Sequence, residues 1–438
     1  MKLWQKNKDI EQVSAQWIEK FTVGNDREFD LLIAKHDIKG SLAHTQMLES
    51  IGLLTKQELE QIHFELKAIL VEIESGIFTI DAEMEDIHSQ IEYILTQKIG
   101  VTGKKIHSGR SRNDQVLLAI KLYLREELIQ ISKSVYQLFE QLMSLSKTHQ
   151  HALMPGYTHM QIAMPSSFGL WFGAYAESLV DDLEFVNAAY LICNKNPLGS
   201  GAGFGSSFPL NRTLTTELLG FDSMNYNVVY AQMTRGKSEK AVAIALSSIA
   251  ATLSKFAYDI CLYMNQNFGF ICFPNALTTG SSIMPHKKNP DVFELIRAKC
   301  NRIQALPNEI TLLINNLPSG YHRDLQLTKE CLFPAIDQMH SSLKIFQFML
   351  EHIIIKNDIL SDEKYAHIYS VERVNELTSA GTPFREAYRE IAKQIEENTF
   401  TPPGKLNHTH EGSMGNLCHI EIREQMKKFE YLYARNEN

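Results

Sequence analysis

One long apolar run, Ser238–Met264, constrains the fold more than any other feature of the sequence, because it is rich in Ala and Ser and carries few charges. A membrane span needs about 20 mainly apolar residues, but Lys255 and Asp259 lie inside this window and its residues are small more often than bulky. A buried helix, whose small side chains let neighbouring helices approach closely, is therefore favoured over a membrane span. At about 1.5 Å per residue this helix would be about 40 Å long, which suits a bundle shared between subunits of a homo-oligomer.

Helical periodicity also dominates elsewhere in the chain. Within Gln57–Phe78 the apolar residues recur at spacings of three and four, which predicts an amphipathic helix with one apolar face. No comparable run alternates with a period of two, so the sequence predicts an all-α fold. The apolar positions of this helix are Leu59, Ile62, Leu66, Ile69, Leu70 and Ile73.

Two interruptions of the helical pattern predict three domains. Residues Gly100–Arg112 separate the N-terminal helices from a long apolar helix that starts near Asp114, and the composition changes again near Lys356–Ser361. We therefore expect an N-terminal helical domain over residues 1–109, a central long-helix domain over 110–359 and a small C-terminal helical domain over 360–438.

Composition and charge exclude several classes of protein. Of 438 residues, 44% are hydrophobic and 21% charged, so a folded globular chain is expected. The net charge is −8 and no block of Lys and Arg is present, which argues against a nucleic-acid partner. Met1–Lys20 lacks the apolar segment of a signal peptide, so we expect a cytoplasmic location. Six scattered cysteines and two isolated His-x-His pairs have no metal-ligand spacing, so neither a metal nor an organic cofactor is expected.

Two glycine-containing segments imitate nucleotide-binding loops without matching them. Gly199–Gly205 fails the G-x-G-x-x-G spacing and follows no β-run, so it predicts a loop with special backbone angles that could contact a ligand. Gly236-Lys237-Ser238 ends like a Walker A loop, but Ala231 stands where the first glycine must be. Phosphate-loop chemistry is therefore excluded.

The segment Thr279–Asp291 is the most informative part of the chain. It is small and polar, with two serines, two lysines and an asparagine, and Pro290 and Asp291 favour the start of a helix directly after it. Such a segment predicts a mobile loop that delivers a hydroxyl and an ammonium group to an anion. An ordinary solvated loop is the alternative, but the combination of residues is unusually specific.

Within this loop, Gly280–Asn289 reads G-S-x-x-M-P-x-K-x-N and resembles the signature of the fumarase/aspartase superfamily, whose members eliminate fumarate from substituted succinates. The resemblance implies an all-α, three-domain fold. It also implies a homotetramer in which the long helices of four subunits form a 20-helix core.

A second motif, His107–Gln115, reads H-S-G-R-S-R-N-D-Q and closely resembles that of the argininosuccinate lyase family, which also includes the δ-crystallins. The resemblance implies the reversible cleavage of argininosuccinate into arginine and fumarate, a step of arginine biosynthesis and of the urea cycle. Further segments match in the family's order: Asp37–His44, Glu85–His88, Met154–Gln161, Pro197–Ala202 and Tyr321–Glu330.

The same resemblance implies four catalytic residues. Ser281 is the general base, and Lys287 activates it and stabilises the carbanion delocalised into a substrate carboxylate. His159 is the general acid for the departing guanidine nitrogen, and Glu294 is the carboxylate that pairs with it.

Seven further polar positions match the family's substrate-binding residues. Arg and Lys suit the carboxylates of the substrate, whereas Gln and Tyr suit its amino-acid end and guanidinium. In the family these segments meet only across subunit boundaries, with three chains contributing to each site. The matching residues are Arg112, Asn113, Thr158, Asn289, Tyr321, Gln326 and Lys329.

Two other functions remain as alternatives. A fumarate-releasing enzyme of the adenylosuccinate lyase type can also carry a histidine at the position of His286, although the 110–115 and 321–329 segments argue against it. A structural protein without activity, like some δ-crystallins, is the other alternative. Retention of Ser281, His159, Lys287 and Glu294 argues against that one.

Overall fold

A computed structural model of the chain describes residues 12–404 and 406–435. The first eleven residues, on which part of the expectation about a signal peptide rests, lie outside the described residues. The described chain is mainly helical, as the sequence predicts. Its helices are α1 (Gln12–Val23), α2 (Asp26–Ser50), α3 (Lys56–Glu74), α4 (Ile87–Ile99), α5 (Val101–Lys104), α6 (Arg112–Thr148), α7 (Phe168–Cys193), α8 (Arg212–Leu218), α9 (Val228–Met233), α10 (Lys237–Met264), α11 (Asp291–Ile314), α12 (Leu327–Leu350), α13 (Ser370–Ser379), α14 (Phe384–Glu396), α15 (His419–Lys427) and α16 (Glu430–Tyr433).

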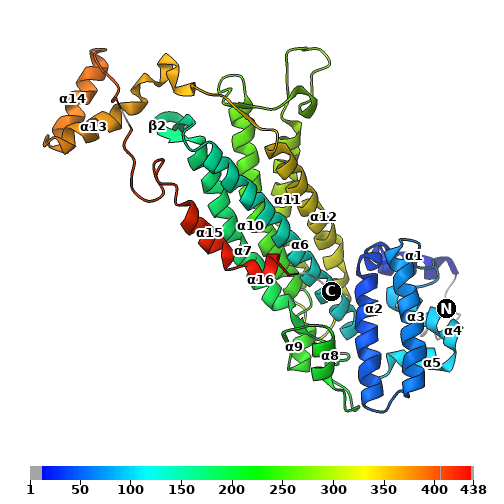
Figure 1. Ribbon diagram of the computed structural model, residues 1–438. Helices are drawn as coiled ribbons and strands as arrows, with labels where there is room; N and C mark the ends of the chain where they lie inside the picture. The colour runs from blue at the N-terminus through cyan, green and yellow to red at the C-terminus, as the bar shows by residue number, and fades with distance from the viewer. Residues whose placement is uncertain (1–11, 405, 436–438) are drawn as a thin grey trace.

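Five long helices, α6, α7, α10, α11 and α12, run side by side and form the central bundle (Figure 1). Helix α10 packs against α7, α11 and α12, and six of its Ala and Leu residues are buried in the main hydrophobic core: Ala243, Ala245, Leu246, Ala250, Leu253 and Ala257. It is also the one described helix with the length and composition of a membrane span. Because 56% of its most apolar window is buried inside the chain, α10 is a core helix, as the sequence predicts.

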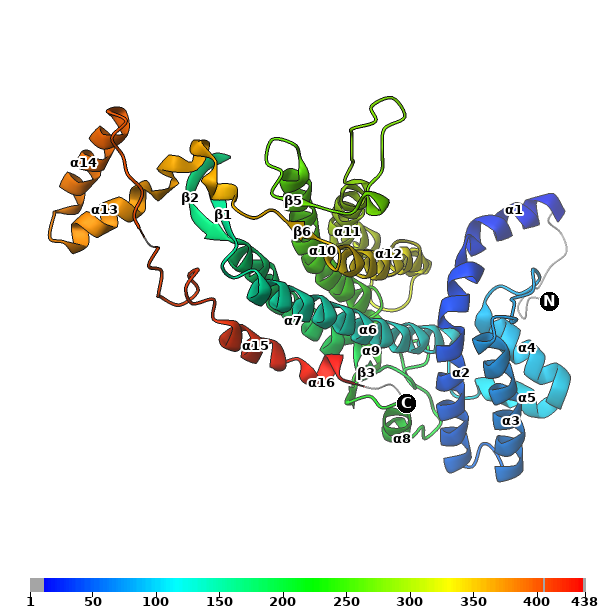
Figure 2. The same ribbon diagram turned by 45° about the horizontal axis from the view of Figure 1, so that its top comes forward.

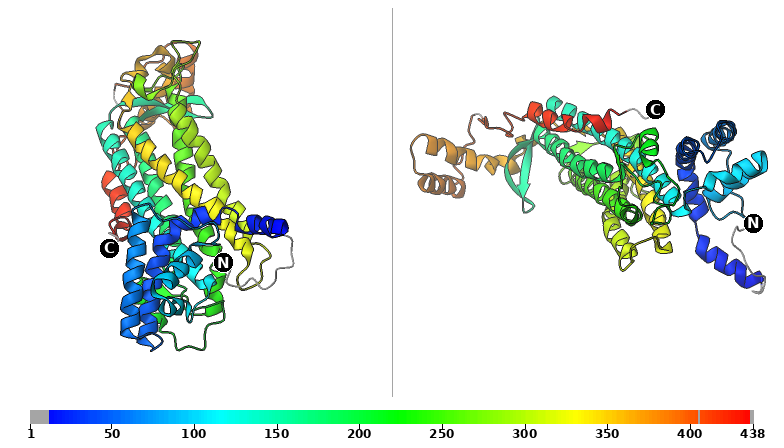
Figure 3. Two further views of the ribbon diagram at one scale, coloured as in Figure 1. Left: turned by 90° about the vertical axis from the view of Figure 1, so that its right-hand side faces the viewer. Right: turned by 90° about the horizontal axis from the view of Figure 1, so that it is seen from below.

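The N-terminal helices α2–α5 form a separate layer at one end of the bundle, while α13 and α14 lie at the opposite end (Figures 1 and 3). Helices α2, α3 and α4 enclose a second hydrophobic core. Helix α3 ends at Glu74, four residues before the end of the predicted run Gln57–Phe78, and its N-terminus is fixed by a capping box between Thr55 and Glu58.

The chain after α14 returns along the bundle, so that α15 packs against α7 and α16 against α6 (Figure 2). Ile422, Met426 and Leu432 of this segment belong to the main core. Segments on both sides of residue 359 therefore contact one another, and the division at residues 109 and 359 stays a prediction.

Strands are few and short. The antiparallel hairpin of β1 and β2 projects beyond the end of α7, and the sequence analysis did not predict it. Short 3-10 turns complete the frame: η1 (Lys105–His107), η2 (Asn275–Leu277), η3 (Arg323–Gln326), η4 (Ile359–Ser361) and η5 (Glu363–Tyr369). The strands are β1 (Leu153–Thr158), β2 (Gln161–Ser167), β3 (Lys195–Asn196), β4 (Ser223–Met224), β5 (Ile271–Cys272) and β6 (Ile354–Ile355), which pair β1 with β2, β3 with β4 and β5 with β6.

Candidate active site

A polar cavity of about 170 Å³ lies where the N-terminal layer meets α6, η3 and α12. Five of the seven predicted substrate-binding residues line it, although they come from segments more than 200 residues apart: Arg112, Asn113, Tyr321, Gln326 and Lys329. The cavity is also lined by residues to which the sequence analysis assigned no role: Asp26, Asp30, Glu85, Asp86, His88, Val116, Arg235 and Arg323.

The 107–115 motif has a structural task at almost every position. Ser111 caps α6 through a capping box with Asp114, which sets the first turn of the helix at the cavity. The buried carboxylate of Asp114 also accepts hydrogen bonds from the backbone N–H groups of Gly199 and Gly201, at 3.0 and 2.8 Å. Arg112 is thereby left to face the cavity.

The glycine-rich segment has the special backbone angles that the sequence predicts. Gly199, Gly201, Gly203 and Gly205 all have positive φ, between 60° and 108°, a region that side chains disfavour. The N–H groups of Gly199 and Gly201 point to Asp114 at the start of α6, whereas those of Gly203 and Gly205 donate to the carbonyl of Ser200 within the loop. The segment therefore serves as a support for that helix.

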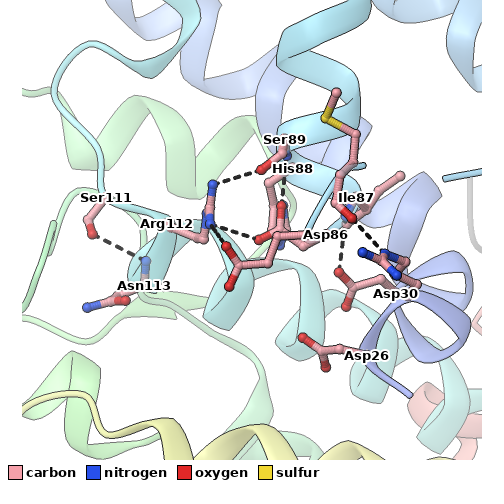
Figure 4. A network of polar contacts seen from close by, with 12 residues as sticks. Asp26, Asp30, Asp86, Ile87, His88, Ser89, Ser111, Arg112 and Asn113 are labelled. Atoms are coloured by element: carbon pink, nitrogen blue, oxygen red, sulfur yellow. Dashed lines mark hydrogen bonds and ion pairs between the residues drawn. The ribbon is translucent and has the colours of Figure 1, made fainter. Parts of the chain in front are cut away.

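Arg112 is held by three groups of the segment that begins α4 (Figure 4). Its Nη1 lies 3.1 Å from Asp86 Oδ2 and 3.5 Å from Glu85 Oε2, and its Nη2 donates to Ser89 Oγ at 2.8 Å. Glu85 also lies 3.0 Å from Arg323 Nη2, so this carboxylate joins α6 to η3. These contacts fix the position of the Arg112 guanidinium at the cavity.

Lys329 occupies the other side of the cavity and is almost completely buried. Its Nζ donates to Asp30 Oδ1 at 2.6 Å and is paired with Asp26. Burial raises the pKa of the Asp26 carboxyl more than Lys329 lowers it. Although burial opposes charge on the ammonium, Asp30 and Asp26 together raise the pKa of Lys329, which stays charged.

Gln326 joins the cavity to the N-terminal segment. Its Nε2 donates to the backbone carbonyls of Thr22 and Val23, at 3.1 and 3.2 Å, directly before Gly24, whose φ is +53°. This contact positions the end of α1 beside the cavity.

The start of α4 connects all sides of the cavity. Ile87 donates its backbone N–H to Asp30 Oδ2 at 3.1 Å (Figure 4). His88 Nδ1 lies 2.8 Å from Asp37 Oδ1. Gln115 of α6 donates to both oxygens of Asp37, at 2.8 and 3.2 Å. One short segment thus fixes α2, α6 and η3 relative to one another.

Ser281 lies in an exposed loop at another part of the chain, beyond the end of α10. A backbone hydrogen bond from Asn289 to Thr279, 2.8 Å long, closes the base of this loop immediately before α11. The Oγ of Ser281 accepts the N–H groups of Met284 and Ile283, at 3.1 and 3.4 Å. Lys287 is exposed in the same loop, and Glu294 is exposed in the first turn of α11.

His159 lies at the tip of the β1–β2 hairpin. It and Met160 both have positive φ, 53° and 61°, between the paired residues Thr158 and Gln161. Two-residue hairpin turns with positive φ favour Asn and Gly, so a histidine at this place is held in a costly conformation. The imidazole is presented at an exposed tip.

The predicted site residues therefore form three separate groups. They occupy the cavity, the hairpin tip and the 279–294 loop, and among the described residues no hydrogen bond or ion pair connects one group to another. One chain by itself does not bring Ser281, His159 and Arg112 together.

Comparison with known proteins decides the family. The profile of a family described as Lyase matches residues 9–305. Argininosuccinate lyase of Bacteroides thetaiotaomicron is 58% identical over 98% of this chain and 95% of its own length. Argininosuccinate lyase of Thermotoga neapolitana is 40% identical over 90% of this chain and 98% of its own length. The chain belongs to the argininosuccinate lyase family.

Solved structures support the fold of this argininosuccinate lyase family member. EDDS lyase in complex with formate has a TM-score of 0.74 at 21% identity, covering 95% of this chain and 90% of that one. Class II fumarase of Schistosoma mansoni has a TM-score of 0.68 at 16% identity, covering 95% of both chains. These structures confirm the predicted fumarase/aspartase-like fold. The argininosuccinate lyase relatives and the family profile confirm the prediction of a carbon–nitrogen lyase.

Sequence analysis of this argininosuccinate lyase family member missed several cavity residues. His88 lines the cavity, and Asp37 is its buried hydrogen-bond partner. Both stand in segments that matched the family, Glu85–His88 and Asp37–His44, yet no role was assigned to either. Arg235 also lines the cavity, 2.9 Å from Glu239 Oε1. The match of these two segments to the family was the available signal for His88 and Asp37.

Proposed function

We propose that the protein is an argininosuccinate lyase, which reversibly converts argininosuccinate into arginine and fumarate. The observation that carries the proposal is the cavity that gathers Arg112, Asn113, Tyr321, Gln326 and Lys329, all of them family positions for binding substrate. The 58% identity to argininosuccinate lyases over nearly the whole chain supports the same function.

In the proposed reaction, Ser281 Oγ removes the proton from Cβ of the succinate part. The electron pair of that C–H bond is first delocalised into the adjacent carboxylate, and it then forms the double bond of fumarate as the bond from Cα to the guanidinium nitrogen breaks. His159 donates the proton that the departing nitrogen takes up together with the electron pair of the broken bond, so the guanidinium of the substrate leaves as the guanidinium of arginine. Lys287 and Asn289 stabilise the negative charge that collects on the substrate carboxylate in between.

Ser281 needs help to act as a base, because an ordinary hydroxyl is too weak an acid to ionise near neutral pH. The two backbone N–H groups that already point at its Oγ supply part of this help, since they stabilise an alkoxide. Lys287, six residues later in the same loop, supplies positive charge. The loop thereby combines the base with its activating groups.

We further propose a homotetramer whose active sites are each shared by three chains. The separation of the cavity, the hairpin tip and the 279–294 loop supports this, because a complete site needs all three groups. Large apolar side chains exposed on the bundle helices support it too, since such residues mark interfaces. They include Phe185 on α7, Tyr258 on α10, Leu295 and Leu312 on α11, and Phe348 on α12. In such an assembly Glu294 would reach His159 of another subunit, and the five long helices of each chain would give the 20-helix core.

The proposed enzyme works in the cytoplasm on a small molecule and contributes to arginine biosynthesis. Burial of α10 in the core supports the location, because that helix is then unavailable to a membrane. The alternatives of an adenylosuccinate-type lyase and an inactive structural protein are not favoured by the relatives of this chain.

The decisive experiment is the rise in ultraviolet absorbance of fumarate when the purified protein meets argininosuccinate, with adenylosuccinate in a parallel cuvette. We expect a rise with argininosuccinate alone. A rise only with adenylosuccinate, or no rise in either, contradicts the proposal. The Ser281→Ala variant should lose nearly all turnover while keeping the tetramer, and substantial residual turnover contradicts the assignment of the base.

A further inference from the structure

His88 is a buried cavity residue with an unused nitrogen. Its side chain lines the cavity, and its Nδ1 is hydrogen-bonded to Asp37 at 2.8 Å. Its Nε2 has no hydrogen-bond partner among the described residues. Gln115 fixes the carboxylate of Asp37 from the other side, so the orientation of the imidazole is determined.

The surroundings of His88 favour its charged form. Burial opposes a charge on the imidazole, but Asp37, Asp86 and Asp30 outweigh burial and raise the pKa of His88. Burial also acts on Asp37, whose pKa is nevertheless lowered, chiefly by His88. Asp37 accepts a hydrogen bond from the Nδ1–H group of His88. The charged imidazole therefore carries its second proton on Nε2, which becomes a cationic hydrogen-bond donor.

The other cations of the cavity are already engaged. Arg112 is held by Glu85 and Asp86, and Lys329 by Asp26 and Asp30. Arg323 is paired with Glu85. Arg235 is paired with Glu239 and donates from Nη2 to the carbonyl of Leu325, although its Nη1 has no hydrogen-bond partner among the described residues. His88 has a carboxylate on one nitrogen only. A buried donor without a partner costs free energy, which a ligand carboxylate would recover.

We propose that His88 is a substrate-binding residue whose Nε2–H donates to the α-carboxylate at the arginine end of the substrate. This assignment rests on the proposed function for the identity of the ligand. The cavity is too small for the whole substrate, because its volume of about 170 Å³ is well below the range of pockets that enclose a whole drug-sized ligand. The succinate end belongs to the Ser281 loop, which lies in a separate group.

Two amide substitutions of His88 distinguish the role of its Nδ1 from that of its Nε2. His88→Asn keeps a group near Nδ1 that can reach Asp37 and removes the donor at Nε2, whereas His88→Gln places its amide near Nε2. The control is His36→Asn. His36 is equally buried on α2 and its Nε2 also lacks a hydrogen-bond partner, but it lines a different cavity.

The measurement is isothermal titration calorimetry of the full-length oligomers with arginine and, separately, with fumarate. We expect His88→Asn to weaken arginine binding at least about 10-fold, the effect of a lost hydrogen bond to a charged group, with fumarate binding unchanged. His88→Gln should recover part of the loss, and His36→Asn should bind arginine as the wild type does.

Wild-type arginine affinity in His88→Asn overturns the assignment. An equal loss of arginine and fumarate binding overturns it as well, because that pattern indicates general damage to the fold. If the wild-type protein binds arginine but does not release fumarate, a selective loss in His88→Asn upholds the binding role while the proposed reaction fails. A wild-type protein that neither binds arginine nor releases fumarate refutes both.

Discussion

The carboxylate of Asp114, in the first turn of α6, lies 3.0 Å from the backbone nitrogen of Gly199, a residue 85 positions later in the chain. The same carboxylate accepts the N–H groups of Gly201 and Ser111. Asp114 is fully buried, so it ties the start of the longest helix to a loop that would otherwise leave several N–H groups without partners. Because Arg112 lies two residues before Asp114, this contact also positions the cavity.

Replacing Asp114 by Asn should therefore destabilise the protein and weaken its activity. An amide offers one oxygen in place of two and turns its own N–H groups toward backbone donors, so at least one buried N–H loses its partner. We expect a loss of about 1–3 kcal/mol in the free energy of unfolding, measured by urea denaturation. Asp222→Asn, at an exposed position, is the control and should change stability by less than about 0.5 kcal/mol. Equal stability of the two variants would contradict this role of Asp114.

Lys329 should be far more sensitive than a surface lysine that also forms an ion pair. Lys329→Met leaves Asp26 and Asp30 close together without their shared cation, and removing one partner of a buried pair costs about 3–5 kcal/mol. Lys98→Met removes an exposed pair with Glu65, which is worth at most about 1 kcal/mol. Urea denaturation of both variants checks the contrast. If the two variants lost similar amounts of unfolding free energy, burial of the Lys329 ion pairs would not increase their contribution to stability.

The Asp37–His88 pair predicts how stability depends on pH. Burial disfavours charge on both groups, but their mutual attraction raises the pKa of His88 and lowers that of Asp37. The contribution of His88 is full below its unfolded pKa of about 6.5 and is lost as pH rises through the folded value. The contribution of Asp37 is present above about 3.8 and is lost as pH falls through its own folded pKa.

Unfolding free energies measured from pH 4 to 9 test these two losses of stability, that of His88 as pH rises and that of Asp37 as pH falls. In His88→Asn the loss on the alkaline side should disappear, while His36→Asn should keep it. The groups that face His88 are Asp86 on its own helix, Asp30 and Asp37 on α2, and His107 before α6. If the unfolding free energy of His88→Asn fell by the same amount at alkaline pH as that of the wild type, the pH dependence would belong to a group other than His88.

The frame of the molecule follows from local patterns, whereas the pairings inside the cavity do not. Helices α3 and α10 begin and end close to their predicted positions because apolar spacing and caps act within a few residues. The ion pair of Asp30 with Lys329 joins positions 299 apart, and nothing in one sequence specifies that partner. The β1–β2 hairpin escaped prediction because Pro155 and Pro165 interrupt its alternation of polar and apolar residues.

The clearest test of shared active sites uses two inactive variants. His159→Asn lacks the acid, and Ser281→Ala lacks the base, so each homotetramer should be inactive by itself. The two residues lie in separate groups of one chain, and we expect each site to take them from different subunits. After unfolding and refolding of an equal mixture, about a quarter of the sites of a randomly mixed tetramer should then contain both wild-type residues. If one chain supplied both residues, every site would carry one of the two substitutions and the mixture would stay inactive. Fumarate release by the refolded mixture, compared with each variant refolded alone and with refolded wild-type protein, therefore distinguishes a shared site from a site built within one subunit.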